Sequence, residues 1–523
     1  MNNLLQTGTA HAHSQLQPQP QPVGVIGAGT MGAGIAQVAA AAGHTVWLMD
    51  LRPGAAQAAI TQIDKVLSTL VDKGRLSAEE RTATTSRLIA ADALSDMAGA
   101  ALIVEVIVEN LEAKQKLMRD LEAVVSPQAV LASNTSSISI TAIANGLHHP
   151  QRVVGMHFFN PVPLMKLVEV VSGAETDAAV AQSIFELAAR WGKTPVHAKS
   201  TPGFIVNRIA RPYYAEALAL LQEQAATPAV IDALARSAGF RMGPCELMDL
   251  IGHDVNFAVT QSVFEANFGD RRYQPSLVQK ALLDGGRLGR KVGKGFYDGL
   301  PAPTSAVVAG ELPTLPAHIV LVGDTPLARS LWARLEARGI PFDCDSHEEW
   351  AGFRVDDVDI RITDGRSAMQ VAVQSDEREL ALIDLPLVAV TLSDKLQPLG
   401  VAFAATTSAR CRQIAIDTLR VCGWQAIEMR DVPGLWAART LCMLVNEAAD
   451  AVHQGVCDEA AADAAMKLGT NWPAGPFEWL QTLGVEQVVS VLDHLYEATR
   501  SERYRVSPWL QQRLWAARAG SVR

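Results

Sequence analysis

Residues 23–32 read Val-Gly-Val-Ile-Gly-Ala-Gly-Thr-Met-Gly, and this stretch decides the fold of the first part of the chain. Its first four residues are predicted to form a short buried strand, the glycines a turn, and residues 33–42 a helix of small side chains that Gly43 ends. Val46 to Met49 is the next apolar strand. The fold therefore begins with a strand-helix-strand unit.

The spacing of the three glycines in this turn is typical of a dinucleotide-binding site. Gly27 permits the tight turn, Gly29 lets the backbone approach a pyrophosphate, and Gly32 lets the helix pack closely on the strand. The phosphate oxygens then meet the unpaired N–H groups and the positive dipole end of the helix. A glycine turn that serves only strand–helix packing is the alternative interpretation.

Asp50 closes the second strand and favours the cofactor interpretation. A carboxylate at this place can accept hydrogen bonds from both hydroxyls of the adenine ribose. It would also repel a 2′-phosphate, so the sequence predicts NAD in preference to NADP. The nearby Arg52 would partly offset that repulsion.

Helical and strand patterns continue to alternate up to residue 199, which predicts a Rossmann-type, doubly wound parallel sheet. The expected helices are residues 54–96 as one amphipathic helix, 111–124 and 178–191. The expected strands are 102–106, 129–131, 153–158 and 167–171.

Beyond this sheet the pattern becomes helical and is then repeated. Ser200 and Thr201, followed by a proline, predict the start of a long helix that carries Asn207, and helices continue to Tyr297. Thr201-Pro-Gly-Phe-Ile-Val-Asn-Arg208 returns as Val432-Pro-Gly-Leu-Trp-Ala-Ala-Arg439. Gly243-Pro-Cys-Glu-Leu247 returns as Gly-Pro-Phe-Glu-Trp within residues 474–479. The helical domain is therefore expected twice.

Before the second helical copy, residues 319–325 read Ile-Val-Leu-Val-Gly-Asp-Thr, which resembles the start of another nucleotide-binding sheet with one glycine instead of three. We therefore expect a degenerate α/β segment there, followed by a second all-α domain. The expected division is a disordered tail (1–22), an NAD-binding domain (23–199), a helical substrate and dimerisation domain (200–300), a linker (301–316), a degenerate Rossmann-like domain (317–430) and a second helical domain (431–523).

Composition excludes several classes of function. A formal charge of −10 over 523 residues argues against nucleic acid or an acidic membrane surface as a partner. The six cysteines lack the spacing of a disulfide framework or a metal site, which fits a reducing cytoplasm. The first 22 residues do not resemble a secretion signal, and no apolar run reaches membrane-spanning length. We expect a soluble cytoplasmic protein without a metal.

A proton-transfer pair follows the dinucleotide site. Oxidation of a secondary alcohol needs a base close to the hydroxyl while hydride leaves, and His157, at the end of an apolar strand, suits that task. Glu169 could fix the imidazole tautomer if the turn at residues 160–163 makes their strands adjacent. Ser136 and Asn207 could hydrogen-bond the reacting oxygen. Each residue alone is also compatible with a purely structural role, and the combination favours catalysis.

Together these residues resemble the L-3-hydroxyacyl-CoA dehydrogenase family over Val23 to about Tyr297. The motifs that carry the resemblance are Gly-Ala-Gly-Thr-Met-Gly (27–32), Val-Glu-Asn (108–110), Ser-Asn-Thr-Ser-Ser (133–137), His-Phe-Phe-Asn-Pro-Val-Pro (157–163), Lys-Leu-Val-Glu (166–169), Thr-Pro-Gly-Phe-Ile-Val-Asn-Arg (201–208) and Gly-Lys-Gly-Phe-Tyr (293–297).

The resemblance implies a role for each matching residue. His157 would be the base, Glu169 its orienting partner, and Ser136 and Asn207 substrate-contacting groups. The cofactor would contact Gly27, Gly29, Thr30, Met31, Gly32, Asp50, Glu109, Lys114, Asn160 and Lys291. Lys65 and Lys73, near the helix that follows the second strand, are candidate partners for the phosphates of CoA.

The implied reaction is NAD-dependent oxidation of an L-3-hydroxyacyl-CoA to the 3-ketoacyl-CoA. The length resembles that of the longer bacterial members, which act on 3-hydroxybutyryl-CoA or on 3-hydroxyadipyl-CoA, the latter in phenylacetate breakdown. Two alternatives stay open: a dehydrogenase of a free hydroxy acid such as a sugar acid, and a non-catalytic NAD-binding sensor.

The second half departs from the family pattern. Ala438 stands at the place of Asn207 and Gly400 near that of Glu169, so we expect this half to be catalytically silent. The resemblance leaves two assemblies open, a homodimer and a monomer whose helical domains pair internally. The expected partner is an acyl-CoA substrate, with neither nucleic acid nor a membrane.

Overall fold

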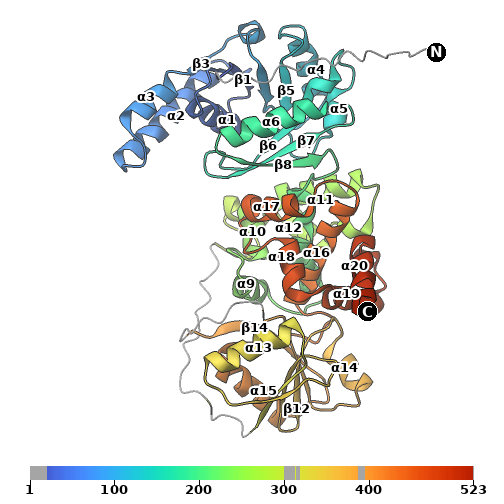
Figure 1. Ribbon diagram of the computed structural model, residues 1–523. Helices are drawn as coiled ribbons and strands as arrows, with labels where there is room; N and C mark the ends of the chain where they lie inside the picture. Colours follow the sequence, from blue (N-terminus) through green and yellow to red (C-terminus); the bar gives the residue numbers. More distant parts are fainter. Residues whose placement is uncertain (1–19, 300–312, 314–317, 387–394, 522–523) are drawn as a thin grey trace, which may run out of the picture. The chain divides into compact units, whose positions relative to one another are not determined.

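The computed structural model describes residues 20–299, 313, 318–386 and 395–521 (Figure 1). The chain forms two compact units, the first ending at Ile205 and the second beginning at Val206. The expected N-terminal tail and linker lie almost entirely outside the described residues. Among the described helices, none combines the length and the apolar composition that crossing a membrane requires.

The first unit is built on an eight-stranded sheet in which β1 separates two halves of opposite order. All neighbouring strands are parallel except β6 and β7, which are antiparallel. The spatial order is β3 (Leu88–Ala90), β2 (Val46–Met49), β1 (Val23–Ile26), β4 (Leu102–Glu105), β5 (Val130–Ser133), β6 (Val153–Phe158), β7 (Leu167–Ser172) and β8 (Thr194–Lys199). Because the order reverses at β1, a crevice for a ligand is expected at the carboxyl ends of β1 and β4.

Helices cover this sheet, as the doubly wound prediction requires (Figure 1). They are α1 (Thr30–Ala41), α2 (Ala55–Asp72), α3 (Ala78–Thr85), α4 (Leu111–Glu122), α5 (Ile140–Ala144) and α6 (Ala178–Arg190), with 3₁₀ turns at Leu94–Met97 and Pro150–Arg152. The apolar sides of α1, α2 and α6 share one core with the strands, and small residues of α1 such as Ala36 and Ala39 are fully buried in it. This close packing holds the start of α1 firmly against β1.

The prediction of one amphipathic helix over residues 54–96 is wrong. α2 ends before Gly74, which has the left-handed φ of 64° that stops a helix. Ser77 and Glu80 then form a reciprocal capping box that starts α3. The short strand β3 follows inside the same segment. The strand β8 was also not predicted, because its exposed residues alternate only partly with buried ones.

The second unit contains two sets of helices, which confirms the predicted repeat. The first set is α7 (Val206–Ile209), α8 (Arg211–Gln222), α9 (Pro228–Ser237), α10 (Pro244–Ile251), α11 (His253–Ala266) and α12 (Leu277–Asp284), with 3₁₀ turns at Arg271–Tyr273 and Arg290–Val292. The second set is α16 (Ala437–His453), α17 (Glu459–Thr470), α18 (Pro476–Leu483), α19 (Val485–Thr499) and α20 (Pro508–Ser521), with a 3₁₀ turn at Glu502–Tyr504.

The long helix expected to begin near Ser200 begins instead at Val206, and it is interrupted at Ala210 between α7 and α8. Gly203 and Phe204 both have positive φ, 80° and 47°, so the chain cannot be helical there in spite of the favourable proline. The second copy has the same turn, with φ of 78° at Gly434 and 51° at Leu435. The Pro-Gly motif therefore marks a turn that precedes the helix.

The two helical sets contact each other through a reciprocal pair of buried ion pairs. Arg208 Nε lies 2.7 Å from Glu447 Oε1, and Arg439 Nε lies 2.8 Å from Glu216 Oε2. All four side chains are nearly or fully buried. Since Arg439 is the counterpart of Arg208 in the repeat, and Glu447 that of Glu216, the contact has the form of a two-fold interface within one chain.

A mixed seven-stranded sheet belongs to the same unit, in the order β10 (Asp343–Asp345), β9 (Ile319–Val322), β11 (Gly352–Val355), β12 (Val358–Ile362), β13 (Leu380–Ile383), β14 (Gln397–Phe403) and β15 (Trp424–Glu428). Its helices are α13 (Pro326–Ala337), α14 (Ala368–Gln374) and α15 (Ala409–Val421). The last three strands repeat the antiparallel and then parallel pairing of β6, β7 and β8. This sheet is the expected degenerate copy of the first.

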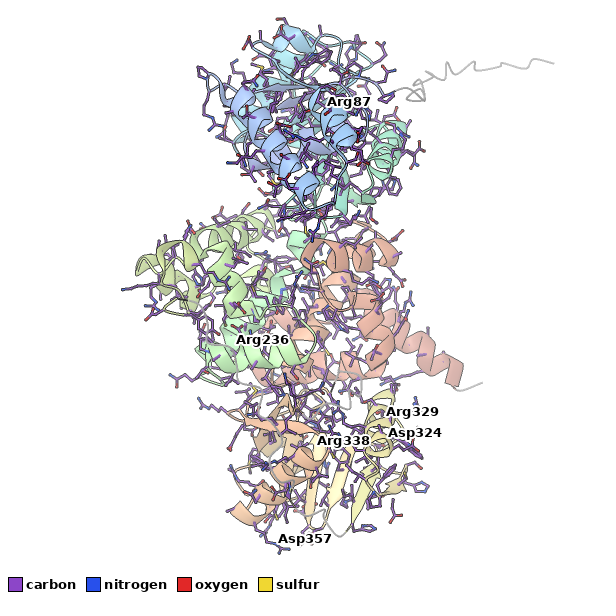
Figure 2. All side chains as sticks on the ribbon, turned by 90° about the vertical axis from the view of Figure 1, so that its left-hand side faces the viewer. Arg87, Arg236, Asp324, Arg329, Arg338 and Asp357 are labelled. Carbon is purple, nitrogen blue, oxygen red and sulfur yellow. The ribbon has the colours of Figure 1, made fainter. Side chains whose placement is uncertain are left out.

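The turn after β9 keeps the strand-to-helix geometry of the first sheet but not its phosphate site. Gly323 has a positive φ of 89°, as Gly27 does. Thr325, however, caps α13 with its own hydroxyl, which accepts the N–H of Ala328 at 3.1 Å. Asp324 adds a negative charge and pairs with Arg329 at 2.8 Å beside it (Figure 2). The start of α13 is therefore closed to a phosphate.

Candidate active site

The glycine turn between β1 and α1 leaves room for a ligand at one position. Gly27 has a φ of 111°, and a Cβ there would lie 2.4 Å from Val106 O. A Cβ on Gly32 would lie 1.8 Å from Gly27 O, so both positions need glycine for packing. A Cβ on Gly29 would meet nothing within 4 Å. The open space is thus beside Gly29, directly before Thr30 and Met31 at the start of α1.

The first turn of α1 lacks a side-chain cap among the described residues. Its N–H groups therefore stay available to an anion, and the helix dipole favours negative charge there. This is the reverse of the start of α13, where a threonine hydroxyl occupies the same place.

Asp50 lies next to this turn and is tied to it. Ala28 N–H donates to Asp50 Oδ2 at 2.8 Å, and the Arg52 guanidinium contacts both carboxylate oxygens at 2.9 and 3.0 Å. These hydrogen bonds from Arg52 hold the pKa of Asp50 well below its usual range, so the carboxylate is ionised. Because the Arg52 side chain is 71% exposed, it can swing into solvent at little cost and free Asp50 for a ligand hydroxyl.

His157 and Glu169 meet across the antiparallel strands β6 and β7, where the register pairs them directly. His157 Nδ1 lies 2.5 Å from Glu169 Oε2. The imidazole is 6% exposed and the carboxylate is fully buried. The contact that the sequence predicted is therefore present, and it leaves Nε2 as the ring atom not engaged by the carboxylate.

Both oxygens of Glu169 have fixed partners, because Oε1 accepts the N–H of Ile205 at 3.0 Å. Phe159 and Phe204 pack against the imidazole, with ring centroids 4.5 and 5.8 Å away. The pair is thus held on the carboxylate side by hydrogen bonds and on the ring faces by aromatic contacts. An imidazole fixed in this way keeps one orientation and one tautomer.

Ser136 lies in a loop that Glu109 organises. Glu109 Oε1 accepts the Thr135 hydroxyl at 2.6 Å and the backbone N–H groups of Ser136 and Ser137 at 3.0 and 3.2 Å. Burial opposes ionisation of Glu109, but the Thr135 hydrogen bond and the charge of Lys114 outweigh it and lower the pKa. Glu109 is therefore a charged anchor for the Ser133–Ser137 loop.

Lys114 is buried beneath this loop in a network that sequence reasoning missed. Its Nζ lies 2.6 Å from Glu105 Oε1 and 3.3 Å from Glu109 Oε2, and Ser133 Oγ donates to Glu105 Oε2 at 2.5 Å. Glu105 gave no signal because a carboxylate at the end of an apolar strand usually faces solvent. Asn134 was missed too, although its Oδ1 accepts the N–H of Phe158 at 2.8 Å and so joins β5 to β6.

The remaining predicted residues lie elsewhere. Asn160 is exposed in the loop after β6, and Lys65 and Lys73 are exposed on α2 and directly after it. Asn207 and Lys291 belong to the second unit, where Lys291 Nζ pairs with Asp254 at 2.5 Å. The first unit thus brings together the glycine turn, Asp50, the Ser133–Ser137 loop and the His157–Glu169 pair.

The corresponding place in the second sheet holds different side chains. Asp384 N–H donates to Gly400 O at 2.9 Å, so Asp384 lies opposite Gly400 as His157 lies opposite Glu169. The Asp384 carboxylate accepts the N–H groups of Trp436, Ala437 and Ala438 at the start of α16. Asp384 thus accepts hydrogen bonds from the start of a helix, as Glu169 accepts one from Ile205. The position of His157 in the first sheet is taken here by Asp384, so no imidazole is present at this place.

Comparison with known proteins agrees with this geometry. Residues 22–201 match the family model of the 3-hydroxyacyl-CoA dehydrogenase NAD-binding domain, and residues 203–299 and 434–522 match the C-terminal domain of the same family. Residues 360–433 match the reduced Rossmann-fold domain of 3-hydroxybutyryl-CoA dehydrogenase.

Individual relatives span the whole chain or its first half. A 3-hydroxyadipyl-CoA dehydrogenase of Escherichia coli (strain K12) is 44% identical over 492 residues, 94% of this chain and 97% of that protein. The crystal structure of 3-hydroxybutyryl-CoA dehydrogenase from Escherichia coli K12 substr. MG1655 has a TM-score of 0.85 at 43% identity, and the match covers 95% of this chain and 98% of that chain. The mitochondrial hydroxyacyl-coenzyme A dehydrogenase of Homo sapiens is 40% identical over 282 residues, 53% of this chain and 90% of that protein. The chain therefore belongs to the 3-hydroxyacyl-CoA dehydrogenase family and is an oxidoreductase whose cofactor is NAD.

Proposed function

We propose that this enzyme oxidises an L-3-hydroxyacyl-CoA to the 3-ketoacyl-CoA with His157 as the general base. The observation that carries the proposal is the 2.5 Å contact between His157 Nδ1 and a fully buried Glu169 in the NAD-binding domain. A base must be within hydrogen-bond reach of the substrate hydroxyl, and an imidazole fixed by a carboxylate meets that need.

Nδ1–H of His157 donates to Glu169, which leaves Nε2 without a proton and able to accept one from the C3 hydroxyl. NAD, when bound, takes the hydride from C3. The Glu169 carboxylate stabilises the imidazolium that results. In the reverse direction, imidazolium Nε2–H returns the proton to the ketone oxygen. Ser136 and Asn207 are proposed to hydrogen-bond the reacting oxygen or the thioester carbonyl.

The cofactor is proposed to lie along the carboxyl ends of β1 and β4. The pyrophosphate would fill the open space beside Gly29 and accept hydrogen bonds from the start of α1, near Thr30 and Met31. Asp50 would receive the adenine ribose hydroxyls after Arg52 turns away. Glu109, Lys114, Asn160 and Lys291 are proposed as further cofactor-lining residues.

The substrate class is proposed to be short-chain or dicarboxylic acyl thioesters, such as 3-hydroxybutyryl-CoA or 3-hydroxyadipyl-CoA. The name of the long Escherichia coli relative supports the second of these substrates, and the name given with the Escherichia coli crystal structure supports the first. Lys65 and Lys73, both exposed, are proposed to contact the phosphates of CoA. The six cysteines are free thiols, which supports a reducing compartment such as the cytoplasm.

The second sheet and its helices are proposed to be catalytically silent. Asp384 and Gly400 replace the imidazole and its carboxylate, and Ala438 replaces Asn207. Thr325 and Asp324 close the place of the phosphate. The reciprocal ion pairs between the helical sets support a role in pairing.

His157→Gln tests the proposal directly. Loss of a general base typically lowers the rate by about 10²–10⁴-fold, so we expect reduction of acetoacetyl-CoA by NADH to fall in that range. Binding of NADH, followed by its fluorescence, should stay unchanged. Wild-type turnover in the variant would contradict the assignment, and lack of inhibition by free CoA would favour a free hydroxy acid as substrate.

A further inference from the structure

A cavity of about 310 Å³ opens beside α8 in the second unit. From the first helical set it is lined by α8, by Thr260 on α11 and by the segment 271–279. From the second set it is lined by Arg439 and by residues between Thr499 and Tyr504. The cavity therefore lies where the two helical sets meet.

The walls of this cavity carry a surplus of positive charge. The arginines that line it are Arg211, Arg271, Arg272, Arg439 and Arg503. Glu223 is the carboxylate among the described lining residues, and Arg439 holds both of its oxygens at 2.9 and 2.8 Å. Arg272 pairs with Asp450 outside the lining. Arg211 and Arg271 form no ion pair with any described carboxylate, so the cavity suits an anion.

Arg211 is the unusual member of this group because it is only 7% exposed. Its Nε donates to Asn207 O at 2.8 Å, and its Nη1 donates to Thr260 Oγ1 at 3.2 Å. The guanidinium also lies over the ring of Tyr214, 5.0 Å from the centroid. Burial lowers the pKa of Arg211, and no described carboxylate offsets that effect. A buried cation whose partners are all neutral strongly favours an incoming anion.

The second helical set shows which side chain can stand at the position equivalent to Arg211 in a folded helix. Arg211 stands three residues after Arg208, and Cys442 stands three residues after Arg439, the counterpart of Arg208. Cys442 is fully buried. The second copy therefore forms one continuous helix, α16, where the first has α7 and α8, and it does so with a small apolar side chain in place of the arginine.

The polar neighbours of Arg211 differ between the sets in the same way. α11 and α19 each follow a glycine, Gly252 and Gly484, from which the two helices can be aligned. Thr260 then corresponds to the fully buried Leu492. Arginine and threonine are thus found together only in the set adjoining the catalytic domain in sequence. An anionic ligand would account for this polar pair.

We propose that Arg211 binds the carboxylate at the far end of the substrate's acyl chain, so that this cavity selects 3-hydroxydicarboxylyl thioesters over monocarboxylic ones. This inference rests on the proposed function, in which Asn207 contacts the substrate near C3. Arg211 is hydrogen-bonded to the backbone of Asn207. In a six-carbon chain three carbon–carbon bonds separate C3 from the terminal carboxyl, and in the sequence Arg211 stands four residues after Asn207. The planar guanidinium can then bind the carboxylate through two N–H groups.

The test compares two thioesters of equal chain length, 3-hydroxyadipyl-CoA and 3-hydroxyhexanoyl-CoA, which differ only in the terminal group. In Arg211→Met we expect kcat/KM to fall about 10–100-fold for the dicarboxylic thioester and to change less than about threefold for the other. Arg211→Lys keeps the charge and should retain part of the preference. Arg241→Gln, which removes an exposed arginine outside the cavity lining, is the control and should change neither value.

Each other outcome contradicts a defined part of the reasoning. Arg211→Met and Arg211→Lys could each lower kcat/KM equally for the two thioesters while the thermal unfolding midpoint stays unchanged. That result would overturn the inference, because Arg211 would then support the helix or bind a carboxylate that does not belong to the substrate. An unchanged preference for the dicarboxylic thioester in Arg211→Met would also overturn it. Wild-type protein that turns over neither thioester would instead refute the proposed function on which the inference rests.

Discussion

Replacement of Glu169 by glutamine should separate the two tasks of this carboxylate, which are to orient His157 and to accept the backbone N–H of Ile205. Glu169 Oε2 lies 2.5 Å from His157 Nδ1, and Oε1 accepts the N–H of Ile205 at 3.0 Å. Glutamine has the same shape but only one acceptor, with an N–H₂ group in place of the second oxygen. It can therefore satisfy one of the two neighbours and must present donors to the other.

In the first arrangement the amide oxygen stays on Ile205 and the N–H₂ group faces His157. Nδ1 must then accept a hydrogen bond, so the proton moves to Nε2 and the ring loses its basic atom on the substrate side. Enforcing the wrong tautomer in a His–carboxylate pair lowers kcat by about 10⁴-fold. Folding stability should change little, because both buried neighbours keep partners.

In the second arrangement the amide oxygen faces Nδ1–H and the N–H₂ group faces the N–H of Ile205. The tautomer is then preserved, but a buried backbone donor loses its acceptor, which costs about 1–3 kcal/mol of stability. The imidazolium also loses its neighbouring negative charge. Stability should fall in this case, and the rate should still decrease by about 10²-fold or more.

The assay is reduction of acetoacetyl-CoA by NADH, together with urea unfolding of the same preparations. Glu186→Gln, on the exposed side of α6, makes the same chemical change away from the site and should match wild type. The magnitude of the unfolding change tells which arrangement the glutamine adopts. A Glu169→Gln enzyme within about tenfold of wild-type kcat, and equally stable, would refute the assignment of both tasks.

Two further predictions concern the helical interface and the cofactor. Glu447→Gln should lower the free energy of unfolding by about 3–5 kcal/mol, because the buried Arg208 and Arg272 lose their charge partner. The control is Glu428→Gln, which removes a charge from the half-exposed pair with Arg412 and should lower the free energy of unfolding by less than about 1 kcal/mol. Burial opposes ionisation of Glu447, yet Arg208 and Arg272 lower its pKa below the ordinary 4.5. The difference in the free energy of unfolding between wild type and Glu447→Gln, measured by urea titration, should therefore be largest above pH 4.5 and become smaller below it. A difference that does not depend on pH would contradict this cause. Asp50→Asn should weaken NADH binding about 10–100-fold and narrow the preference over NADPH, measured by fluorescence titration; unchanged affinity would remove Asp50 from the ribose site.

The sequence predicted the elements whose signal is local and periodic. The strand, glycine turn and helix at residues 23–41 were found because apolar runs and glycine spacing both mark them. The contact between His157 and Glu169 followed from strand adjacency across a short proline-containing turn. The helical repeat was visible because two motifs recur in the same order.

What the sequence did not predict depends on contacts distant along the chain. The break between α2 and α3 needs a left-handed Gly74 and a capping box, and amphipathic periodicity conceals both. The buried Glu105–Lys114 pair has no pattern of its own, since each residue alone resembles a solvated charge. Arg211 likewise becomes informative only when its cavity and its counterpart Cys442 are known.

The reciprocal arginine–glutamate contacts between the helical sets have a consequence for how this protein can evolve. In a homodimer every substitution is made on both sides of the axis at once, so each change must suit its own mirror image. Here the two sides are encoded separately and are always present in equal amounts. One side can accordingly drift, losing its chemistry or filling a pocket, while selection still preserves the other.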